Sequence, residues 1–453
     1  MKIKVWAVVL ILFLLVNLTM PIVLAIETTN GMCGNNATWI LDDSGKLTIT
    51  GTGIVKDGGW NKDSIKKVEI GEGITEIDEL AFDKLQLLEE VILPDSLITI
   101  GWGAFNECIK LKKINIPDNV ETIKEHAFHW CNSLDNINIP SKMSIINDYT
   151  FYGCKAFTTI EIPENIEKIG SGAFGQCSNL TSIIIPSKIT EIEDYTFRDC
   201  IELETIHIPN NIISIGKNAF LDCTKLKNVE LSENLTTINE SAFSGCKELT
   251  NIIIPESVTT INKYAFEECE NLTDITIPES VTTIKPYVFY KCTNLKNVTL
   301  SNNITSIGEW AFSTCTNLEK IVLPKSITFI DNYAFYGCEK LTKVEVPKNV
   351  TTITLKSNTF GLCENVKVYI YNKNIVETLE KNNINYVLIL KGDVNGDDKV
   401  NVKDWNMMYE HINETSFLAE EEFERADVNN DGKVNGKDWN RLYEHINETN
   451  PLW

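Results

Sequence analysis

Phenylalanine recurs at a fixed interval of 23 residues through most of the chain. Twelve phenylalanines run in equal steps from Phe82 to Phe335, and Phe360 follows two residues late. A cysteine lies three positions after each of them except Phe82, from Cys108 to Cys363, and a leucine usually follows three positions later. A period kept over so many copies indicates stacked repeats, each forming one structural unit.

Each copy also contains a short segment with strand periodicity. Ile114 and Ile116 flank Asn115 and precede Pro117, and the same order returns in later copies. The two isoleucines point to one side of a strand and the residue between them to the other, while proline ends the strand because it cannot donate a ladder hydrogen bond. The Ala-Phe-x-x-Cys segment is expected to form a tight turn or short helix leading to the next strand.

One copy cannot bury its apolar side alone, so stacking should turn the Phe, Cys, Leu and Ile positions into continuous interior ladders. The expected fold class is a repeat solenoid of short strands with turns or short helices. The pattern I-P-x-x-[VI]-x-x-I-x-x-x-A-F-x-x-C-x-x-L resembles the leucine-rich repeats of BspA-like bacterial surface proteins over residues 65–363. Residues 26–64 are similar to the β-hairpin cap of such arrays, and residues 364–391 resemble their closing strand and helix, followed by a linker.

The thirteen cysteines allow two interpretations. Disulfide frameworks are typical of small exported domains that lack a core. Twelve of these cysteines instead occupy one position of the repeat, where a small and slightly polar group suits a stacked interior. The sequence therefore favours buried free thiols, and Cys33 lies outside the ladder without an obvious partner.

Residues 1–25 have the composition of a secretory signal peptide. Lys2 and Lys4 precede the apolar run VWAVVLILFLLV. The segment VLA, which ends at Ala25, supplies the small residues expected before a cleavage site. The alternative is a retained membrane anchor, but the run falls short of the about 20 apolar residues that a spanning helix needs. We expect an exported mature chain that begins near Ile26 and has no membrane span after cleavage.

The charge balance narrows the possible partners. The chain has 63 acidic and 41 basic side chains, which gives a formal net charge of −22. Nucleic acids and anionic membranes would repel such a chain. The composition fits a soluble protein that handles cations or neutral polymers.

The C-terminal tail, residues 392–453, contains one sequence twice. Residues 392–415 and 426–449 are identical at 18 of 24 aligned positions. Each copy begins with an acidic loop whose alternate positions carry oxygen-bearing side chains, and Ca²⁺ prefers about six to eight oxygen ligands. One such loop could be an ordinary acidic surface loop, but two in register, each leading into a helix, indicate two calcium ions. The expected ligands at positions 1, 3, 5, 7, 9 and 12 are Asp393, Asn395, Asp397, Lys399, Asn401 and Asp404 in the first loop, and Asp427, Asn429, Asp431, Lys433, Asn435 and Asp438 in the second, with position 7 acting through its backbone carbonyl.

The two loops depart differently from the usual EF-hand pattern. Position 6 favours glycine, which Gly432 supplies and Asp398 does not. The first site is therefore predicted to be the weaker one. Position 12 is Asp in both loops instead of Glu, and the first loop lacks a preceding helix.

The duplicated D-x-N-x-D-x-K-V-N-x-x-D, with one helix per loop, resembles a type I dockerin over residues 392–453. The resemblance implies a small, all-α, EF-hand-like domain that binds a cohesin module of a scaffoldin in a cellulosome. The apolar positions 405, 408 and 412, and their equivalents 439, 442 and 446, are expected to form core. The family's recognition positions fall on Val402, Lys403, Tyr409 and Glu410 in the first unit, and Gly436, Lys437, Tyr443 and Glu444 in the second. Many members carry a Ser-Thr pair where this chain has Val-Lys and Gly-Lys.

The sequence shows no recognisable set of catalytic residues. His126 and His129 flank Phe128 in one repeat only and lack a third metal ligand, and no pair of carboxylates can be chosen for glycoside hydrolysis. The outward strand residues are mixed and mostly polar, such as Asn136, Thr205 and Lys343, which favours an unidentified protein or surface ligand.

The favoured interpretation is a non-catalytic, secreted and extracellular component, attached to a cell-surface cellulosome through its tail. One alternative is a polysaccharide or protein hydrolase with its site on the solenoid. Another is a cell-surface adhesin in which the dockerin is incidental.

Overall fold

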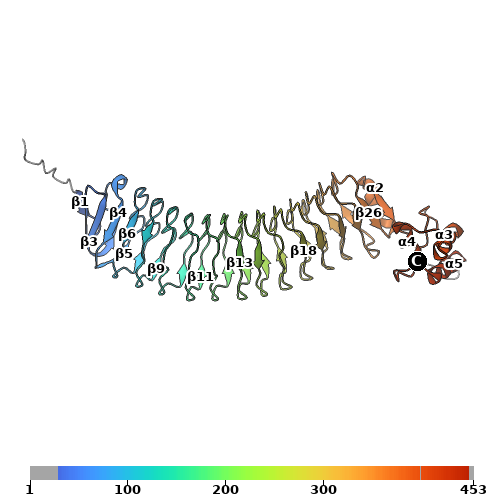
Figure 1. Ribbon diagram of the computed structural model, residues 1–453, viewed down its shortest axis with the longest axis horizontal. Coiled ribbons are helices and arrows are strands. Elements are labelled where there is room, and N and C mark those ends of the chain that lie inside the picture. Colours follow the sequence, from blue (N-terminus) through green and yellow to red (C-terminus); the bar gives the residue numbers. More distant parts are fainter. Residues whose placement is uncertain (1–28, 398, 448–453) are drawn as a thin grey trace, which may run out of the picture.

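A computed structural model describes residues 29–397 and 399–447 as a curved solenoid that ends in a small group of helices (Figure 1). The expected signal peptide and the expected start of the mature chain lie outside the described residues, as does Asp398. Within the described part of the chain, no helix has the length and apolarity needed to cross a membrane.

The N-terminal end of the solenoid is closed by an antiparallel sheet, β1 (Thr29–Met32), β2 (Asn36–Leu41) and β3 (Lys46–Val55). The ten-residue strand β3 is long enough to start two ladders. Its first half pairs in parallel with β4 (Lys67–Ile70) and its second half with β5 (Ile74–Ile77). A 3₁₀ turn, η1 (Lys62–Ser64), precedes β4.

Most coils contribute to two parallel strand ladders, whereas the sequence predicted one strand per repeat. The first ladder lies at the expected Ile-x-Ile segments and is interrupted at residues 137–139, 160–162 and 183–185, which form no strand. Its strands after β4 are β6 (Glu90–Ile92), β8 (Lys113–Ile114), β13 (Thr205–His207), β15 (Asn228–Glu230), β18 (Asp274–Thr276), β20 (Asn297–Thr299), β22 (Lys320–Val322), β24 (Lys343–Glu345) and β26 (Lys367–Ile370). The second ladder uses two-residue strands just before the turn: β7 (Thr99–Ile100), β9 (Thr122–Ile123), β10 (Ile145–Ile146), β11 (Lys168–Ile169), β12 (Glu191–Ile192), β14 (Ser214–Ile215), β16 (Thr237–Ile238), β17 (Thr260–Ile261), β19 (Thr283–Ile284), β21 (Ser306–Ile307), β23 (Phe329–Ile330) and β25 (Thr354–Leu355).

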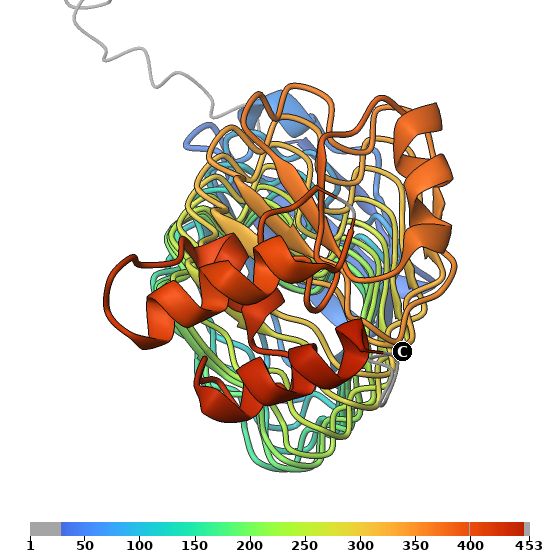
Figure 2. The ribbon, with the colours of Figure 1, turned by 90° about the vertical axis from the view of Figure 1, so that its right-hand side faces the viewer.

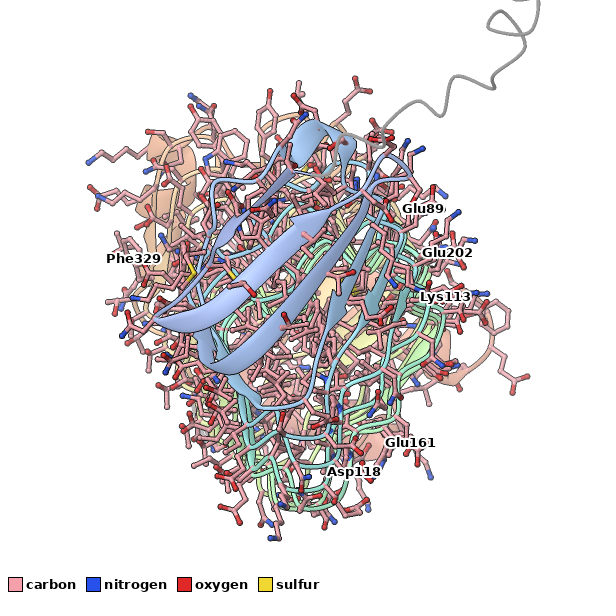
Figure 3. All side chains as sticks on the ribbon, turned by 90° about the vertical axis from the view of Figure 1, so that its left-hand side faces the viewer. Glu89, Lys113, Asp118, Glu161, Glu202 and Phe329 are labelled. Atoms are coloured by element: carbon pink, nitrogen blue, oxygen red, sulfur yellow. The ribbon has the colours of Figure 1, made fainter. Side chains whose placement is uncertain are left out.

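The two ladders lie on opposite flanks of the coil. In the view from the capped end, Lys113 of the first ladder and Phe329 of the second project on opposite sides (Figure 3). The second ladder escaped the sequence prediction because two residues are too few to show an alternating pattern. The Ala-Phe-x-x-Cys segments between the ladders form turns.

The predicted phenylalanine ladder fills the interior. Rings of neighbouring coils stack with centroids 5.2–6.0 Å apart and planes within 17° of parallel. Trp60 covers the first ring, 5.3 Å from Phe82. Twelve of the ladder phenylalanines are fully buried, and Phe360 at the end is 8% exposed. One continuous core therefore runs along the solenoid.

The cysteine ladder consists of buried free thiols, as the sequence favoured. Each repeat thiol lies 3.1–3.3 Å from the carbonyl oxygen of a phenylalanine in the preceding coil, for example Cys223 Sγ and Phe197 O at 3.1 Å. Burial raises the pKa of Cys108 to about 12, so its thiol keeps the proton that it donates. The ladder position thus needs a small side chain with a donor.

The solenoid ends with β26, a 3₁₀ turn η2 (Lys373–Ile375), α2 (Val376–Lys381) and β27 (Tyr386–Leu388), which pairs in parallel with β26. This is the closing strand and helix that the sequence suggested. The tail follows with three helices: α3 (Val402–Ile412), α4 (Glu420–Ala426) and α5 (Gly436–Ile446). Seen from this end, α3 and α5 lie side by side across the end of the solenoid (Figure 2).

Candidate metal centre and docking helices

Each acidic loop of the tail is continuous with the start of a helix. Asn435 is the N-cap of α5, and its side chain accepts a hydrogen bond from Lys437 N at 2.9 Å. Asp438 completes the capping box by accepting from Asn435 N at 3.2 Å. The first loop repeats this arrangement with Asn401 and Asp404 at the start of α3. Positions 9 and 12 of each loop therefore order the helix as well as the loop.

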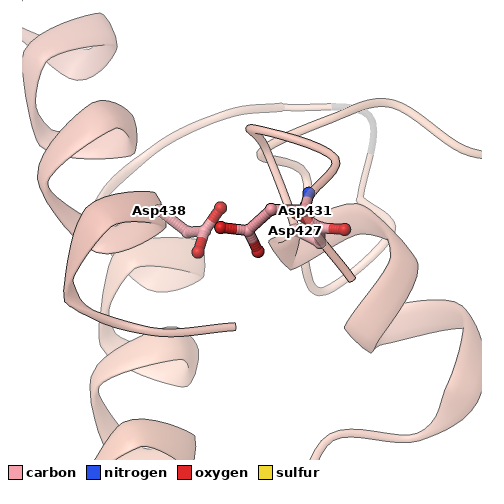
Figure 4. Close-up of side chains that lie close together, drawn as sticks. All are labelled: Asp427, Asp431 and Asp438. Atoms are coloured by element: carbon pink, nitrogen blue, oxygen red, sulfur yellow. The ribbon is translucent and has the colours of Figure 1, made fainter. Parts of the chain in front are cut away.

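The second loop brings three carboxylates together. Asp427, Asp431 and Asp438 each offer an oxygen, and these oxygens lie within 4.8 Å of one another (Figure 4). Asp427 and Asp438 are buried, while Asp431 is exposed. Burial raises the pKa of Asp438, and the charges of Asp427 and Asp431 add to this effect, although backbone hydrogen bonds oppose it. Crowded and partly desolvated carboxylates of this kind fit a hard divalent cation.

The two loops share the same internal hydrogen bonds. Asp427 Oδ1 accepts from Asp431 N at 3.1 Å, and Asp438 Oδ1 accepts from Asn429 N at 3.2 Å. In the first loop, Asp397 N donates to Asp393 Oδ1 and Asn395 N donates to Asp404 Oδ1, each at 3.0 Å. Asp393 and Asp404 are buried like their counterparts. The duplicated sequence thus gives both loops the same hydrogen-bond pattern, although among the described residues a group of three carboxylates within 4.8 Å is found in the second loop only.

The other predicted ligands take supporting positions in the loops. Asn429 Oδ1 accepts from Asp431 N at 2.9 Å, and Lys433 N donates to Asp431 Oδ1 at 3.0 Å. In the first loop, Asp397 N and Lys399 N make the equivalent contacts at 2.9 and 3.1 Å. These bonds hold positions 3, 5 and 7 of each loop in a tight turn.

The helices α3 and α5 meet around a pair of stacked tryptophans. The rings of Trp405 and Trp439 lie 4.3 Å apart, and each tyrosine of one helix approaches the tryptophan of the other, with Tyr409–Trp439 at 5.9 Å and Tyr443–Trp405 at 6.0 Å. The contacts repeat when the two helices are exchanged. The tail therefore has an internal pseudo-twofold arrangement.

The expected apolar core of these helices is only partly correct. Met408 and Leu442 are fully buried, together with Val394 and Ala426. Positions 405, 439 and 446 are partly buried, and position 412 is intermediate. The indole Nε1 atoms of both tryptophans are buried without a hydrogen-bond partner. The tryptophan pair therefore lies at the edge of this core.

All eight residues predicted to contact a cohesin are exposed. The set comprises Val402, Lys403, Tyr409 and Glu410 on α3, and Gly436, Lys437, Tyr443 and Glu444 on α5. Tyr409 and Tyr443 are 53% and 54% exposed, although they contact the tryptophan pair. The structure thus leaves matching surfaces of two helices available, with large aromatic side chains at equivalent places.

An aromatic row on the turn side of the solenoid escaped the sequence analysis, which considered only the outward residues of the predicted strands. Tyr264, Tyr287, Trp310 and Tyr333 stack across four coils, with centroids 4.7, 6.3 and 4.3 Å apart. Each lies two positions before a ladder phenylalanine, so the 23-residue period could have revealed the row. Several coils closer to the N-terminus, His129 is stacked on Tyr152 and its pKa is lowered to about 4, first by burial and then by His126.

This architecture defines a class of protein: a strand-ladder repeat solenoid that carries a duplicated loop–helix module with crowded acidic loops. The chain belongs to the BspA type leucine-rich repeat family, whose profile matches residues 54–161, 144–273 and 259–386. Its C-terminal part is a type I dockerin domain, matched over residues 391–447. Type I dockerins are calcium-binding, and a dockerin implies docking to a cohesin in a cellulosome-like, typically extracellular assembly.

Solved structures agree on the solenoid. A leucine-rich repeat protein from Bacteroides ovatus is 25% identical with a TM-score of 0.63, covering 79% of this chain and 100% of its own. A leucine-rich repeat protein from Eubacterium ventriosum is 23% identical with a TM-score of 0.53, covering 74% of this chain and 95% of its own, which shows the fold alone. No curated protein matches the chain.

Proposed function

We propose that this protein is a non-catalytic, secreted cellulosome component. Its tail binds one calcium ion in each loop and then presents α3 and α5 to a cohesin module of a scaffoldin. Its solenoid holds a protein or surface ligand. The observation that carries the proposal is the group of three second-loop carboxylates within 4.8 Å at the start of a helix.

Calcium would act in this tail as a structural ion. Asp427 and Asp438 lie buried with Asp431 beside them, so without a cation their mutual repulsion opposes the folded loop. When bound, the ion supplies the positive charge that compensates these carboxylates, and binding free energy becomes folding free energy. Because Asp438 also caps α5, ordering the loop orders the helix.

The docking surface would be used in two equivalent ways. Lys403, Tyr409 and Glu410 on α3 have identical counterparts on α5, and all are exposed. The pseudo-twofold contacts of the tryptophan pair place these sets in related positions. A cohesin could therefore dock in either of two orientations related by half a turn. Position 10 differs, with Val402 in one helix and Gly436 in the other, so the two orientations need not be equally strong.

The test uses the full mature chain and a panel of cohesin modules, measured by calorimetry with calcium and with a chelator. We expect binding with calcium and at least a hundredfold loss with the chelator. Lys403→Glu with Tyr409→Ala should leave binding through α5, and Lys437→Glu with Tyr443→Ala should leave binding through α3. The four substitutions together should abolish binding, with Ser416→Ala in the exposed loop as the control. Full binding in the chelator, or by the fourfold variant, would refute the proposal.

The surface charges of the solenoid support a binding role more than a catalytic one. Lys225, Lys247 and Lys291 each bond a glutamate of a neighbouring coil at 2.7 Å. These carboxylates are bound to lysines instead of facing a second carboxylate across a cleft, as glycoside hydrolysis requires. Assays of the full chain against plant polysaccharides and casein test this part. Turnover that one carboxylate substitution removes would establish an enzyme instead.

A further inference from the structure

The helix α4, between the two loop–helix units, contacts the last coils of the solenoid through one acidic face. Glu421 Oε1 lies 3.3 Å from Lys367 Nζ and accepts a hydrogen bond from the Tyr369 hydroxyl at 2.9 Å. Glu424, three residues further along the helix, accepts from the Tyr371 hydroxyl at 2.8 Å. Residues 367, 369 and 371 alternate along and just beyond β26, so one strand face meets one helix face.

The preceding coil extends the same contact. Lys343 Nζ of β24 lies 3.1 Å from Glu420 and 3.0 Å from Glu345, and it sits over the Tyr369 ring at 5.0 Å. Burial lowers the pKa of Lys343, but its bonds to Glu345 and Glu420 outweigh this and raise it. Burial and the bond to Glu421 raise the pKa of Tyr369 to about 12. These groups form one connected network between the solenoid and α4.

Backbone contacts complete the attachment. The Arg425 guanidinium donates to Leu388 O, at 3.2 Å from Nη2, and Gly392 N donates to Arg425 O at 2.8 Å. Lys391 Nζ donates to Glu424 O. The end of β27, the linker and the last turn of α4 are therefore joined by groups that do not depend on the acidic face alone.

We propose that these contacts form a latch. The basic, tyrosine-bearing strand face of β24 and β26 is an interaction surface whose partner is the acidic helix α4 of the same chain. The latch makes the solenoid and the tail one rigid unit, so a cohesin that grips α3 or α5 also fixes the direction in which the solenoid points. In Figure 1, α4 lies between the solenoid and the other two helices, as this role requires.

The latch also restricts both acidic loops at their first residue. Asp427 follows Ala426, the last residue of α4, and its N–H donates to Phe423 O at 2.9 Å. Asp393 follows Gly392, which is bonded to Arg425. A loop whose entry is already fixed loses less conformational entropy when it folds around an ion. Releasing the latch should therefore weaken calcium binding without removing any ligand.

The test measures hydrogen exchange of α4 and calcium binding by the full mature chain, with calcium itself as the probe. Glu421→Lys should speed hydrogen exchange of α4 about tenfold and raise the calcium Kd about threefold. The substitution removes a charged hydrogen bond and places a second positive charge beside Lys367. Adding Lys367→Glu should restore most of both values. Tyr371→Phe should speed exchange by a smaller factor, since it removes a single hydrogen bond.

Lys320→Glu is the matched control, because Lys320 occupies the place of Lys343 one coil earlier. It should leave α4 unchanged. Unchanged exchange in both Glu421→Lys and Tyr371→Phe, with the solenoid melting normally, would overturn the latch. Failure of the chain to bind any cohesin would affect the proposed function and not this inference, because neither measurement uses a cohesin.

Discussion

The solenoid and the tail are both built by repetition, but they obtain stability from different sources. Each coil of the solenoid adds a buried phenylalanine, and most add a cysteine and a leucine, to a core that extends from Cys33 to Leu379. Among the residues of the tail that the structure describes, the hydrophobic core has four fully buried members, Val394, Met408, Ala426 and Leu442. The tail has instead two loops with buried aspartates. Many copies can supply one another with apolar surface, whereas two copies cannot.

This difference explains where each part of the chain places its polar groups. In the solenoid, the thiols of the cysteine ladder pair with carbonyl oxygens of the preceding coil. In the tail, the buried carboxylates of Asp427 and Asp438 lie beside Asp431, so that like charges are close together. We therefore expect the tail to be the part whose folding depends on a bound ion.

The largest expected effect is the removal of calcium. A chelator should abolish protection from hydrogen exchange in α3 and α5 and leave the solenoid ladders protected, because only the tail gains folding free energy from the ion. At a hundredfold excess over Kd, one ion contributes about 2.7 kcal/mol. Exchange mass spectrometry of the full chain reads both regions in one experiment. A solenoid that loosens together with the tail would remove the distinction between them.

The second prediction concerns the solenoid instead of the tail, where a substitution creates a cavity in the core. Phe220→Ala removes a fully buried ring that stacks at 5.4 and 5.2 Å on its two neighbours. The expected cost is about 3–5 kcal/mol of unfolding free energy, measured by urea denaturation. The calcium Kd of the tail should not change. Phe417→Ala, at a side chain that is 78% exposed, is the control and should cost little.

The sequence predicted the solenoid better than the tail because of the number of copies. Phe220 and Cys223 could be placed in the interior since the same positions recur throughout the repeats. Two-residue strands such as Thr237–Ile238 are too short to show a period. The contact of Glu421 with Tyr369 joins residues 52 positions apart and occurs once, so no pattern could indicate it.

A third prediction compares the two loops with each other. Asp438→Asn removes a carboxylate from the second site, and Asp404→Asn does the same in the first. Each should weaken its own site by about 1–3 kcal/mol, in line with the loss of a charged interaction. We expect Asp438→Asn to weaken calcium binding more, because glycine at position 6, Gly432, predicts that the second loop is the stronger site. Calorimetric calcium titration of both variants shows which substitution weakens calcium binding more. Equal losses of affinity would contradict this prediction.

The smallest expected effect is the response of the latch to pH. Burial would raise the pKa of Glu421, but the bonds from Tyr369 and Lys367 outweigh it, and the pKa is lowered. A carboxyl with a lowered folded-state pKa stabilises the fold fully above the ordinary Glu pKa of about 4.3 and loses this contribution as pH falls through the lower folded value. Because Glu421 is partly exposed, the gain is below about 1 kcal/mol. The opening free energy of α4, from hydrogen exchange, should differ between the wild type and Glu421→Gln at neutral pH. The difference should shrink to nothing in acid, and a difference that grows toward low pH would show that Glu421 does not hold the helix by its charge.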